Sequence, residues 1–267
     1  MKQRLVIEVG GTWTRIGRAV GGRLVAGQKL PTARPWSAAR KVLVGATGEL
    51  FLGHKVQEVV MGLPGVLDQK QTKLQRAPNL PDWQQQPIKQ DMRRIYRAPV
   101  TLVNDAVLGA VGEAQHGAGK GAAIVGYLSV GTGIGGARVV HGAIDRYTVG
   151  FEPGHQIIDQ GRTLEELIGG RTLEHRFGTD WSSLTADNWH WIEQWLAIGL
   201  VNITNLWSPN RIVLGGSVVQ RGRISMVRLR TLLRRWLRTI SEPPAVVKAS
   251  LGDQAGLWGG ARFPGNN

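Results

Sequence analysis

Two short glycine-threonine turns are the groups in this chain best suited to bind phosphate. Gly10-Gly11-Thr12 follows the apolar stretch 4–9, and Gly131-Thr132-Gly133 follows the apolar stretch 123–130. A second apolar stretch comes after each turn, so each segment is typical of a β-hairpin whose exposed N–H groups could face anionic oxygens. One such turn alone would be interpreted as a simple tight turn. Two in one chain indicate two similar half-folds that bind one phosphate chain, as in a kinase or an ATPase.

The second turn also satisfies the G-x-G-x-x-G string of dinucleotide-binding folds, over residues 131–136. That motif requires a strand before it and a helix after it. Here the following residues, 137–141, have the composition of a strand. We therefore reject the dinucleotide interpretation of this turn.

Asn104-Asp105 is a further candidate for chemistry. The pair follows the apolar residues Val100–Val103 and precedes a segment rich in Ala, Leu and Gly that is typical of a helix. A carboxylate at the carboxyl end of a strand lies where α/β proteins place ligands. Either residue could also serve as the N-cap of the helix, and the pair taken alone favours the cap.

A carboxylate and an imidazole, Glu152 and His155, lie three residues apart in an expected loop. Glu152 could accept hydrogen bonds from adjacent hydroxyls of a polyol, and His155 could donate or accept them. The two could also be metal ligands, but the chain has no Cys to complete a typical zinc set. Taken alone, His155 is equally well interpreted as a structural histidine.

The elements that must position these groups alternate along the chain. Strands are expected at 4–9, 13–20, 23–30, 58–63, 100–103, 123–130, 136–141, 211–216 and 245–250, and helices at 36–52, 105–115, 164–177, 187–206, 224–240 and 253–262. The proline-containing residues 76–90 and residues 145–163 are expected to be loops. Each half opens with a hairpin and continues into alternating helices and strands. This pattern predicts an α/β chain with an approximate structural repeat and a boundary near Asn104-Asp105.

Length and composition bound the class of protein. The chain has 267 residues, of which 42% are hydrophobic, which suits one large domain or two modest ones. No apolar run approaches the roughly 18 residues of a membrane span, and the first residues lead directly into a strand, so we expect neither a membrane partner nor a signal peptide. The absence of Cys excludes disulfides and is compatible with a cytoplasmic protein.

Positive charge is concentrated in one segment. The formal net charge is +14, and seven arginines fall between Arg221 and Arg238. Apolar residues recur among them at helical spacing, which favours an amphipathic surface helix with a solvated face. A site for nucleic acid or for a membrane surface is the alternative. Because Trp236 is the only aromatic residue there, we do not expect nucleic acid to be a partner.

Read together, these motifs resemble the ROK family of sugar kinases, the bacterial glucokinase-like branch of the actin/hexokinase/Hsp70 ATPase fold. The matching segments follow the order of the family along nearly the whole chain: Glu8–Arg15, Leu63–Asp68, Arg76–Trp83, Val103–Ala106, Gly117–Gly121, Val130–Gly136, Glu152–His155, Thr163–Gly170 and Ile212–Ser217. The resemblance implies a two-domain actin-like ATPase (ribonuclease H-like) fold with an interdomain active-site cleft. It implies a small domain over 1–104, on which a tail over about 251–267 could pack, and a larger domain over 105–250.

The resemblance also implies an activity and a set of site residues. The activity is ATP-dependent phosphorylation of a hexose at its 6-hydroxyl, with glucose as the first choice, Mg²⁺ as cofactor and a homodimer as the assembly. Asp105 would be the catalytic base. The sugar would be bound by Asn79, Asn104, Asp105, Glu152, His155 and Glu165, the phosphates by Gly10, Gly11, Thr12, Gly131, Thr132 and Gly133, and the adenosine by Gly215 and Gly216.

Two departures from the family pattern bear on this expectation. The family's first motif usually begins with Asp, whose carboxylate orients Mg²⁺ through water, and this chain has the longer Glu8. The family also commonly binds zinc with three Cys and the His of the sugar motif. This chain has no Cys, so no structural zinc is expected.

Two alternatives stay open at the level of sequence, and a third is not expected. Glu8 is compatible with a catalytically weakened ROK-like protein that binds sugar. Kinases for an N-acetylhexosamine, mannose or fructose share the same motifs. A regulator acting through an N-terminal helix-turn-helix is not expected, because only a few residues precede the first motif.

Overall fold

The computed structural model describes residues 1–148 and 150–264, and the chain divides into two compact units. Unit 1 comprises Met1–Gly112, Arg146–Gly150 and Asp253–Asn267, and unit 2 comprises Glu113–Asp145 and Phe151–Gly252. The domain boundaries expected from the sequence stay a prediction, and the last part of the expected tail, 265–267, lies outside the described residues.

Unit 1 is built on a five-stranded sheet with the strand order β3-β2-β1-β4-β7. Its strands are β1 (Gln3–Val9), β2 (Trp13–Val20), β3 (Arg23–Pro31), β4 (Glu58–Leu63) and β7 (Val100–Asn104), and its helices are α1 (Trp36–Phe51), η1 (Pro81–Trp83), α2 (Ile88–Tyr96), the start of α3 (Asp105–His116) and α9 (Ala255–Ala261). A small hairpin, β5 (Val66–Leu67) and β6 (Leu74–Arg76), lies outside this sheet. The first three strands are antiparallel, whereas β4 and β7 run parallel to β1. Parallel strands require crossover connections, which α1 and α2 supply.

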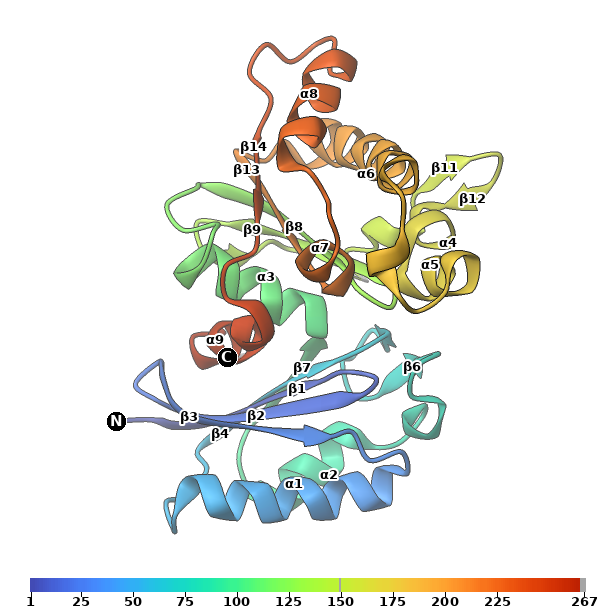
Figure 1. Cartoon of the computed structure of the whole chain (residues 1–267). Coiled ribbons are helices and arrows are strands. Elements are labelled where there is room, and N and C mark those ends of the chain that lie inside the picture. The colour runs from blue at the N-terminus through green and yellow to red at the C-terminus, as the bar shows by residue number, and fades with distance from the viewer. Residues whose placement is uncertain (149, 265–267) are drawn as a thin grey trace. The chain divides into compact units, whose positions relative to one another are not determined.

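Helices cover both faces of this sheet (Figure 1). Alternate residues of β1 point to opposite faces, as the pleat of a strand requires. Leu5, Ile7 and Val9 pack in the core with α1 and α2, whereas Val6 packs on the other face with Leu257 of α9. The period of two in the apolar residues of β1 therefore fixes which helix each residue meets.

Helices α9 and α3 approach each other closely enough that no side chain fits at the contact. A Cβ atom at Gly259 would overlap the carbonyl oxygen of Leu108, and one at Gly112 would overlap that of Ala255. Only glycine permits backbones to approach this closely. The segment that begins with η4 (Gly252–Gln254) is thereby held against α3 and the sheet of unit 1.

Unit 2 repeats the sheet of unit 1. Its strand order is β10-β9-β8-β13-β14, again an antiparallel hairpin followed by two parallel strands. The strands are β8 (Ile124–Val130), β9 (Ile134–Val140), β10 (Ala143–Ile144), β13 (Arg211–Gly215) and β14 (Ala245–Lys248), and the helices are η2 (Pro153–His155), α4 (Leu164–Ile168), α5 (Gly170–Phe177), η3 (Trp181–Ser183), α6 (Ala186–Trp207), α7 (Ser217–Arg221) and α8 (Met226–Trp236). A short hairpin, β11 (Ile157–Asp159) and β12 (Arg162–Thr163), stands apart from this sheet. The approximate repeat predicted from the two glycine turns is confirmed.

Helices α4, α6 and α8 build the core of unit 2 with the sheet. Leu128 and Val130 of β8 share a buried cluster with Leu196 of α6 and with Leu229 and Leu233 of α8. The arginines of α8 lie between these buried residues in sequence and are exposed, so the helix is amphipathic as predicted. None of the helices in the described part of the chain is long and apolar enough to cross a membrane.

Most of the predicted strands and helices are confirmed, and three of the predicted segments differ from the structure. The expected loop 76–90 is partly wrong, because α2 begins at Ile88 directly after Pro87, and proline is well tolerated where a helix begins. The expected helix 164–177 is broken at Gly169 into α4 and α5. The expected loop 145–163, one residue of which lies outside the described range, contains η2 and the β11–β12 hairpin. Helix α7 was not anticipated.

The glycine contact of α9 makes a testable prediction. Gly259→Ala should lower the free energy of unfolding by about 1–3 kcal/mol, because the methyl group forces the two helices apart. Gly45→Ala is the matched control, since a side chain there meets nothing within 4 Å, and it should raise stability by about 0.5–1 kcal/mol through helix propensity. Chemical denaturation followed by circular dichroism measures both. Equal effects of the two substitutions would contradict the packing interpretation.

Candidate functional site

The first glycine turn of unit 1 keeps its carbonyl oxygens engaged. Gly10 N–H donates to the Trp13 carbonyl at 2.9 Å and closes the hairpin. Thr32 donates from its N–H to the Thr12 carbonyl at 2.9 Å and from its hydroxyl to the Gly10 carbonyl at 2.8 Å. No backbone hydrogen bond among the described residues engages the N–H groups of Gly11 and Thr12. The turn therefore has donors suited to anionic oxygens.

Asn79 lies beside this turn. A Cβ atom at Gly11 would come within 3.3 Å of the Asn79 Cβ, so the glycine leaves room for the asparagine. The Asn79 carbonyl accepts a hydrogen bond from Arg34 Nη1 at 2.7 Å, which holds this loop in place. Two predicted site segments of unit 1 are thus neighbours in space.

Asn104 and Asp105 end β7 and begin α3. Both side chains accept from the Ala106 N–H, through Oδ1 in each case and at 2.9 Å. Asn104 also donates from Nδ2 to the Gly65 carbonyl at 3.0 Å. The capping role that the pair alone favoured is therefore present, and both side chains stay partly exposed. A ligand can reach the Asp105 carboxylate while the cap is intact.

One carboxylate oxygen of the half-buried Glu8 is buried and lacks a hydrogen-bond donor in the described part of the chain. Its Oε2 atom is buried without a partner among the described residues, and a Cβ atom at Gly256 of α9 would overlap its carboxylate. Burial raises the pKa of Glu8 to about 7; Arg15 opposes this rise, and the carboxylates of Asp105 and Asp253 add to it. Glu8 and Asp105 therefore lie close enough to interact.

The residues of unit 1 fit a hydrated Mg²⁺ ion. Mg²⁺ is usually bound by one or two carboxylates together with waters and substrate phosphates. Glu8 offers an unpaired carboxylate oxygen, and Asp105 offers a partly exposed carboxylate. The described residues contain no group of three or more His, Cys, Asp or Glu side chains arranged to hold a metal ion. A protein cage is not needed for an ion that is shared with phosphate.

The second glycine turn, in unit 2, is tied to α5. Gly131 N–H closes the hairpin by donating to the Gly133 carbonyl at 2.9 Å. The carbonyls of Gly131 and Thr132 accept from Gly170 N–H at 2.7 Å and Arg171 N–H at 3.0 Å. The predicted helix breaks at Gly169 for this reason, since the first N–H groups of α5 turn toward the hairpin. As in unit 1, the carbonyl oxygens of the turn are engaged.

Glu165 supports the same turn. Its Oε2 accepts from the Ile134 N–H at 2.6 Å, and a Cβ atom at Gly133 would come within 2.5 Å of that oxygen. The carboxylate expected to bind sugar thus also fixes the second glycine hairpin. Its contact with a sugar stays a prediction.

Glu152 precedes the short helix η2 and His155 is its last residue; η2 packs on β9. A Cβ atom at Gly154 would overlap the Ile134 carbonyl oxygen, so this glycine lets the loop dock on the hairpin. The Glu152 Oε2 and His155 Nε2 atoms are 3.9 Å apart, and both side chains are exposed. Burial of its carboxylate raises the pKa of Glu152; His155 lowers it, and Glu165 raises it. The three predicted sugar-binding residues of unit 2 therefore form one cluster.

Gly215 and Gly216 end β13 beside the second turn. A Cβ atom at Gly216, which has a φ of 85°, would overlap the backbone of Val130. One at Gly215 would lie 2.6 Å from the Tyr127 hydroxyl. Gly216 therefore lets this chain segment reach the end of β8, directly before Gly131, and Gly215 leaves room for the Tyr127 side chain.

Two charged residues beside Glu8 were missed by the sequence reasoning. Arg15 is the direct cross-strand partner of Glu8, and its Nη2 forms an ion pair with Asp253 Oδ2 at 2.7 Å. The predicted hairpin was the signal that could have placed Arg15 opposite Glu8. Nothing in the sequence placed Asp253 there, because it belongs to the last segment of the chain.

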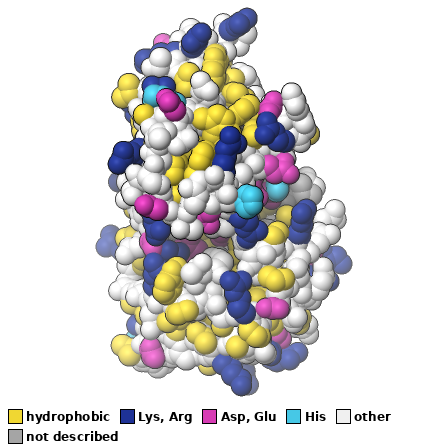
Figure 2. Space-filling view, turned by 45° about the vertical axis from the view of Figure 1, so that its right-hand side comes forward, with side chains coloured by type: hydrophobic (Ala, Val, Ile, Leu, Met, Phe, Trp, Pro, Cys, Tyr) yellow, Lys and Arg dark blue, Asp and Glu magenta, His cyan; other side chains and the backbone are white. Residues whose placement is uncertain are grey.

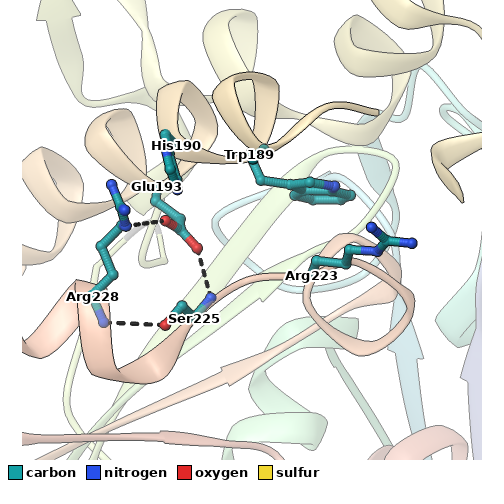
Figure 3. Close-up of a pocket in the computed structure, with 7 residues that line it drawn as sticks. Trp189, His190, Glu193, Arg223, Ser225 and Arg228 are labelled. Atoms are coloured by element: carbon teal, nitrogen blue, oxygen red, sulfur yellow. Dashed lines mark hydrogen bonds and ion pairs between the residues drawn. The ribbon is translucent and has the colours of Figure 1, made fainter. Parts of the chain in front are cut away.

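A separate pocket of about 290 Å³ lies in unit 2, between the start of α6 and the start of α8. Its buried Glu193 accepts from Ser225 N–H at 2.6 Å and pairs with Arg228 Nε at 3.2 Å (Figure 3). Trp189, His190 and Arg223 also line it. None of the predicted site residues does. The ion pair stabilises the contact of α6 with α8.

The surface of unit 2 carries an aromatic group on α5 and α6. The Arg176 guanidinium lies 4.3 Å from the Trp191 ring centroid, and Phe177 and Trp195 each make an edge-to-face contact with Trp191. On the face shown in Figure 2, hydrophobic side chains gather in the upper part, and Lys and Arg side chains are spread over the whole view. The positive charge visible there does not form one continuous patch.

The buried carboxylate of Glu8 gives a pH-dependent prediction. Because its pKa rises from 4.5 to about 7 on folding, the folded protein binds more protons between these values, and stability falls as the pH rises through them. The ionised group should cost up to about 3 kcal/mol above this window and nothing below it. Glu8→Gln should therefore be more stable than the wild type at about pH 8 and equal to it at about pH 4.5, as measured by denaturant unfolding.

The control for this experiment is Glu174→Gln, which removes an exposed carboxylate from α5. Its effect should be small and independent of pH. A stability difference for Glu8→Gln that stays constant across the pH range would contradict the burial argument.

Comparison with known proteins places these features in a family. The family model described as "ROK family" matches residues 4–264. A glucokinase of Streptomyces coelicolor is 25% identical, over 96% of this chain and 95% of its own length. A ROK hexokinase of Thermus thermophilus superposes with a TM-score of 0.84 at 28% identity, covering 97% of this chain and 96% of its own. A ROK glucokinase of Streptomyces griseus, in complex with glucose and AMPPNP, gives 0.80 at 26% identity and covers 97% and 98%. The predicted actin-like ATPase fold is confirmed, and the chain belongs to the ROK family.

Proposed function

We propose that this chain is an ATP-dependent hexose kinase that transfers the γ-phosphate to the 6-hydroxyl of a sugar, with glucose as the preferred substrate. The observation that carries the proposal is the Asn104-Asp105 pair, whose carboxylate stays accessible at the end of β7 while the pair caps α3. The relatives support the reaction class, since those compared above are glucokinases and a hexokinase.

Asp105 would accept the proton of the attacking hydroxyl. Its carboxylate is oriented by the Ala106 N–H and follows a buried strand, so it is held in one direction. A carboxylate is a weak base at neutral pH, but phosphoryl transfer has a loose transition state in which proton transfer comes late. Positioning of the hydroxyl therefore matters more than basicity.

The sugar would be bound by hydrogen bonds. The proposed partners are Asn79, Asn104, Asp105, Glu152, His155 and Glu165. Support comes from the shared cluster of Glu152, His155 and Glu165, where acceptors and a donor face adjacent positions.

The nucleotide would be bound by the two glycine turns and by the glycines after β13. The N–H groups of Gly11 and Thr12, and those of Thr132 and Gly133, would donate to phosphate oxygens. Gly215 and Gly216 would let the chain approach the adenosine. Glu8 and Asp105 would hold Mg²⁺ through water, and the ion when bound supplies neutralisation of phosphate charge. Homodimer formation is proposed from the family alone.

A catalytically weakened sugar-binding protein is the second candidate, and Glu8 favours it. A carboxylate with a pKa of about 7 is partly protonated at neutral pH. A protonated carboxyl is a poor partner for Mg²⁺. An assay of ADP release in the presence of glucose and Mg²⁺ separates the two candidates.

Replacement of the base tests the proposed chemistry. Asp105→Asn should lower kcat by about 10²–10⁴-fold and leave sugar affinity within about threefold, because Asn keeps the cap and a hydrogen-bonding oxygen. Asp187→Asn is the control, since that side chain on α6 is 99% exposed. ADP release and sugar binding by calorimetry measure the two effects. A near-normal kcat for Asp105→Asn would overturn the assignment of the base.

Substrate preference is tested with a panel of sugars. We expect the highest kcat/KM with glucose, compared with mannose, fructose, N-acetylglucosamine and N-acetylmannosamine. Glu152→Gln should raise the KM for the sugar about tenfold or more, as loss of a charged hydrogen bond does, and should leave the KM for ATP unchanged. Glu166→Gln is the control, because Gln can replace Glu in the capping box of α4. A higher kcat/KM with another sugar would replace glucose in the proposal.

A further inference from the structure

Two ion pairs made by Asp253 of the C-terminal segment lie beside Glu8 in unit 1. Asp253 Oδ2 pairs with Arg15 Nη2 at 2.7 Å and with Lys29 Nζ at 2.9 Å. These three residues come from η4, β2 and β3. Arg15 is in turn the cross-strand partner of Glu8 on β1. The Arg15 guanidinium therefore links Asp253 of the C-terminal segment to Glu8, the candidate metal ligand.

The two charges that face each other across β1 and β2 are both incompletely satisfied. Glu8 Oε2 and Arg15 Nε are buried and have no hydrogen-bond partner among the described residues. The Arg15 side chain is only 17% exposed. A buried guanidinium next to a buried carboxylate stabilises its ionised form. Without an anchor, however, a long arginine side chain has several rotamers available.

Asp253 supplies this anchor, and α9 holds Asp253 in place. The overlap that a side chain at Gly256 would make with the Glu8 carboxylate shows that the helix closes directly over it. The contact of Gly259 with Leu108 fixes the same helix against α3. The C-terminal segment thus contributes both a wall and a charged anchor to the surroundings of Glu8.

We propose that Arg15 and Asp253 are positioning residues: Asp253 holds the Arg15 guanidinium opposite Glu8, so that the Glu8 carboxylate keeps the orientation needed for the metal–nucleotide complex. The inference rests on the proposed function only in its assignment of Glu8 to Mg²⁺. It needs no assumption about the sugar or about turnover. Neither residue touches the reacting atoms.

Lys29 provides the matched comparison. It also pairs with Asp253, but its side chain is 46% exposed and lies over the Trp13 ring at 5.0 Å from the centroid. It does not face Glu8 in the strand register, where Arg15 does. If these ion pairs act only through surface charge, Lys29 and Arg15 should contribute equally to MgADP binding. If they act through the position of Glu8, only Arg15 and Asp253 should contribute.

The experiment is calorimetric binding of ADP to the full chain, with and without Mg²⁺. Asp253→Asn should weaken MgADP binding about tenfold, as loss of an outer partner of a metal ligand does, and should change binding of Mg²⁺-free ADP less than about twofold. Because Asp253 is 67% exposed, the variant should fold, and thermal unfolding checks this. Asp253→Glu should recover most of the affinity, and Lys29→Gln should stay within about twofold of the wild type.

The outcomes separate the inference from the proposed function. Equal MgADP affinity of Asp253→Asn and wild type would overturn the inference, as would an equal loss with and without Mg²⁺. So would failure of the wild-type chain to bind MgADP. A wild-type chain that binds MgADP but phosphorylates no sugar would contradict the proposed function and leave the test of Arg15 and Asp253 intact.

Discussion

The contact of α9 with α3 in unit 1 is the constraint on which the surroundings of Glu8 depend. Backbone meets backbone there, since side chains at Gly112 and Gly259 would overlap carbonyl oxygens. This contact fixes the segment that carries Asp253 and Gly256, and both residues border the Glu8–Arg15 pair. Residues from the first strands and from the C-terminal segment are therefore brought together by close helix packing, and the surroundings of Glu8 depend on α9.

In unit 2, glycines also permit close backbone contacts, and these contacts position the second glycine turn and the loop of Glu152 and His155. Gly154 lets the loop of Glu152 and His155 dock on β9, and Gly216 lets the end of β13 reach β8. Gly170 gives its N–H to the Gly131 carbonyl, which breaks the helix and fixes the turn. At each of these positions a side chain would overlap the backbone of the hairpin, so glycine is needed for the contact. The turn and the candidate sugar cluster are consequently supported by one set of contacts.

The pKa of Glu8 depends on how the fold buries its side chain. Its carboxylate is buried under α9, and burial raises its pKa to about 7. Glu8 stands where the family usually has Asp. Burial disfavours the charged form of its carboxylate, and Arg15 partly opposes this effect of burial. Binding of a cation would compensate the cost of ionisation in the same place. If Glu8 binds a metal ion as proposed, the affinity for that ion would be coupled to the stability of the fold.

The sequence by itself determined the α/β class, the repeated hairpins and the family, because glycine turns, apolar strands and ordered motifs are local patterns. The predicted first hairpin contained the signal for Arg15 opposite Glu8, but that pairing was recognised only in the structure. The sequence could not place Asp253 beside them or show that Glu165 supports the second turn. It also missed the break at Gly169, where Gly170 bonds to the distant Gly131. These depend on contacts between segments far apart in the chain, and only the tertiary structure decided them, since packing sets which distant groups meet and how deeply each charge is buried.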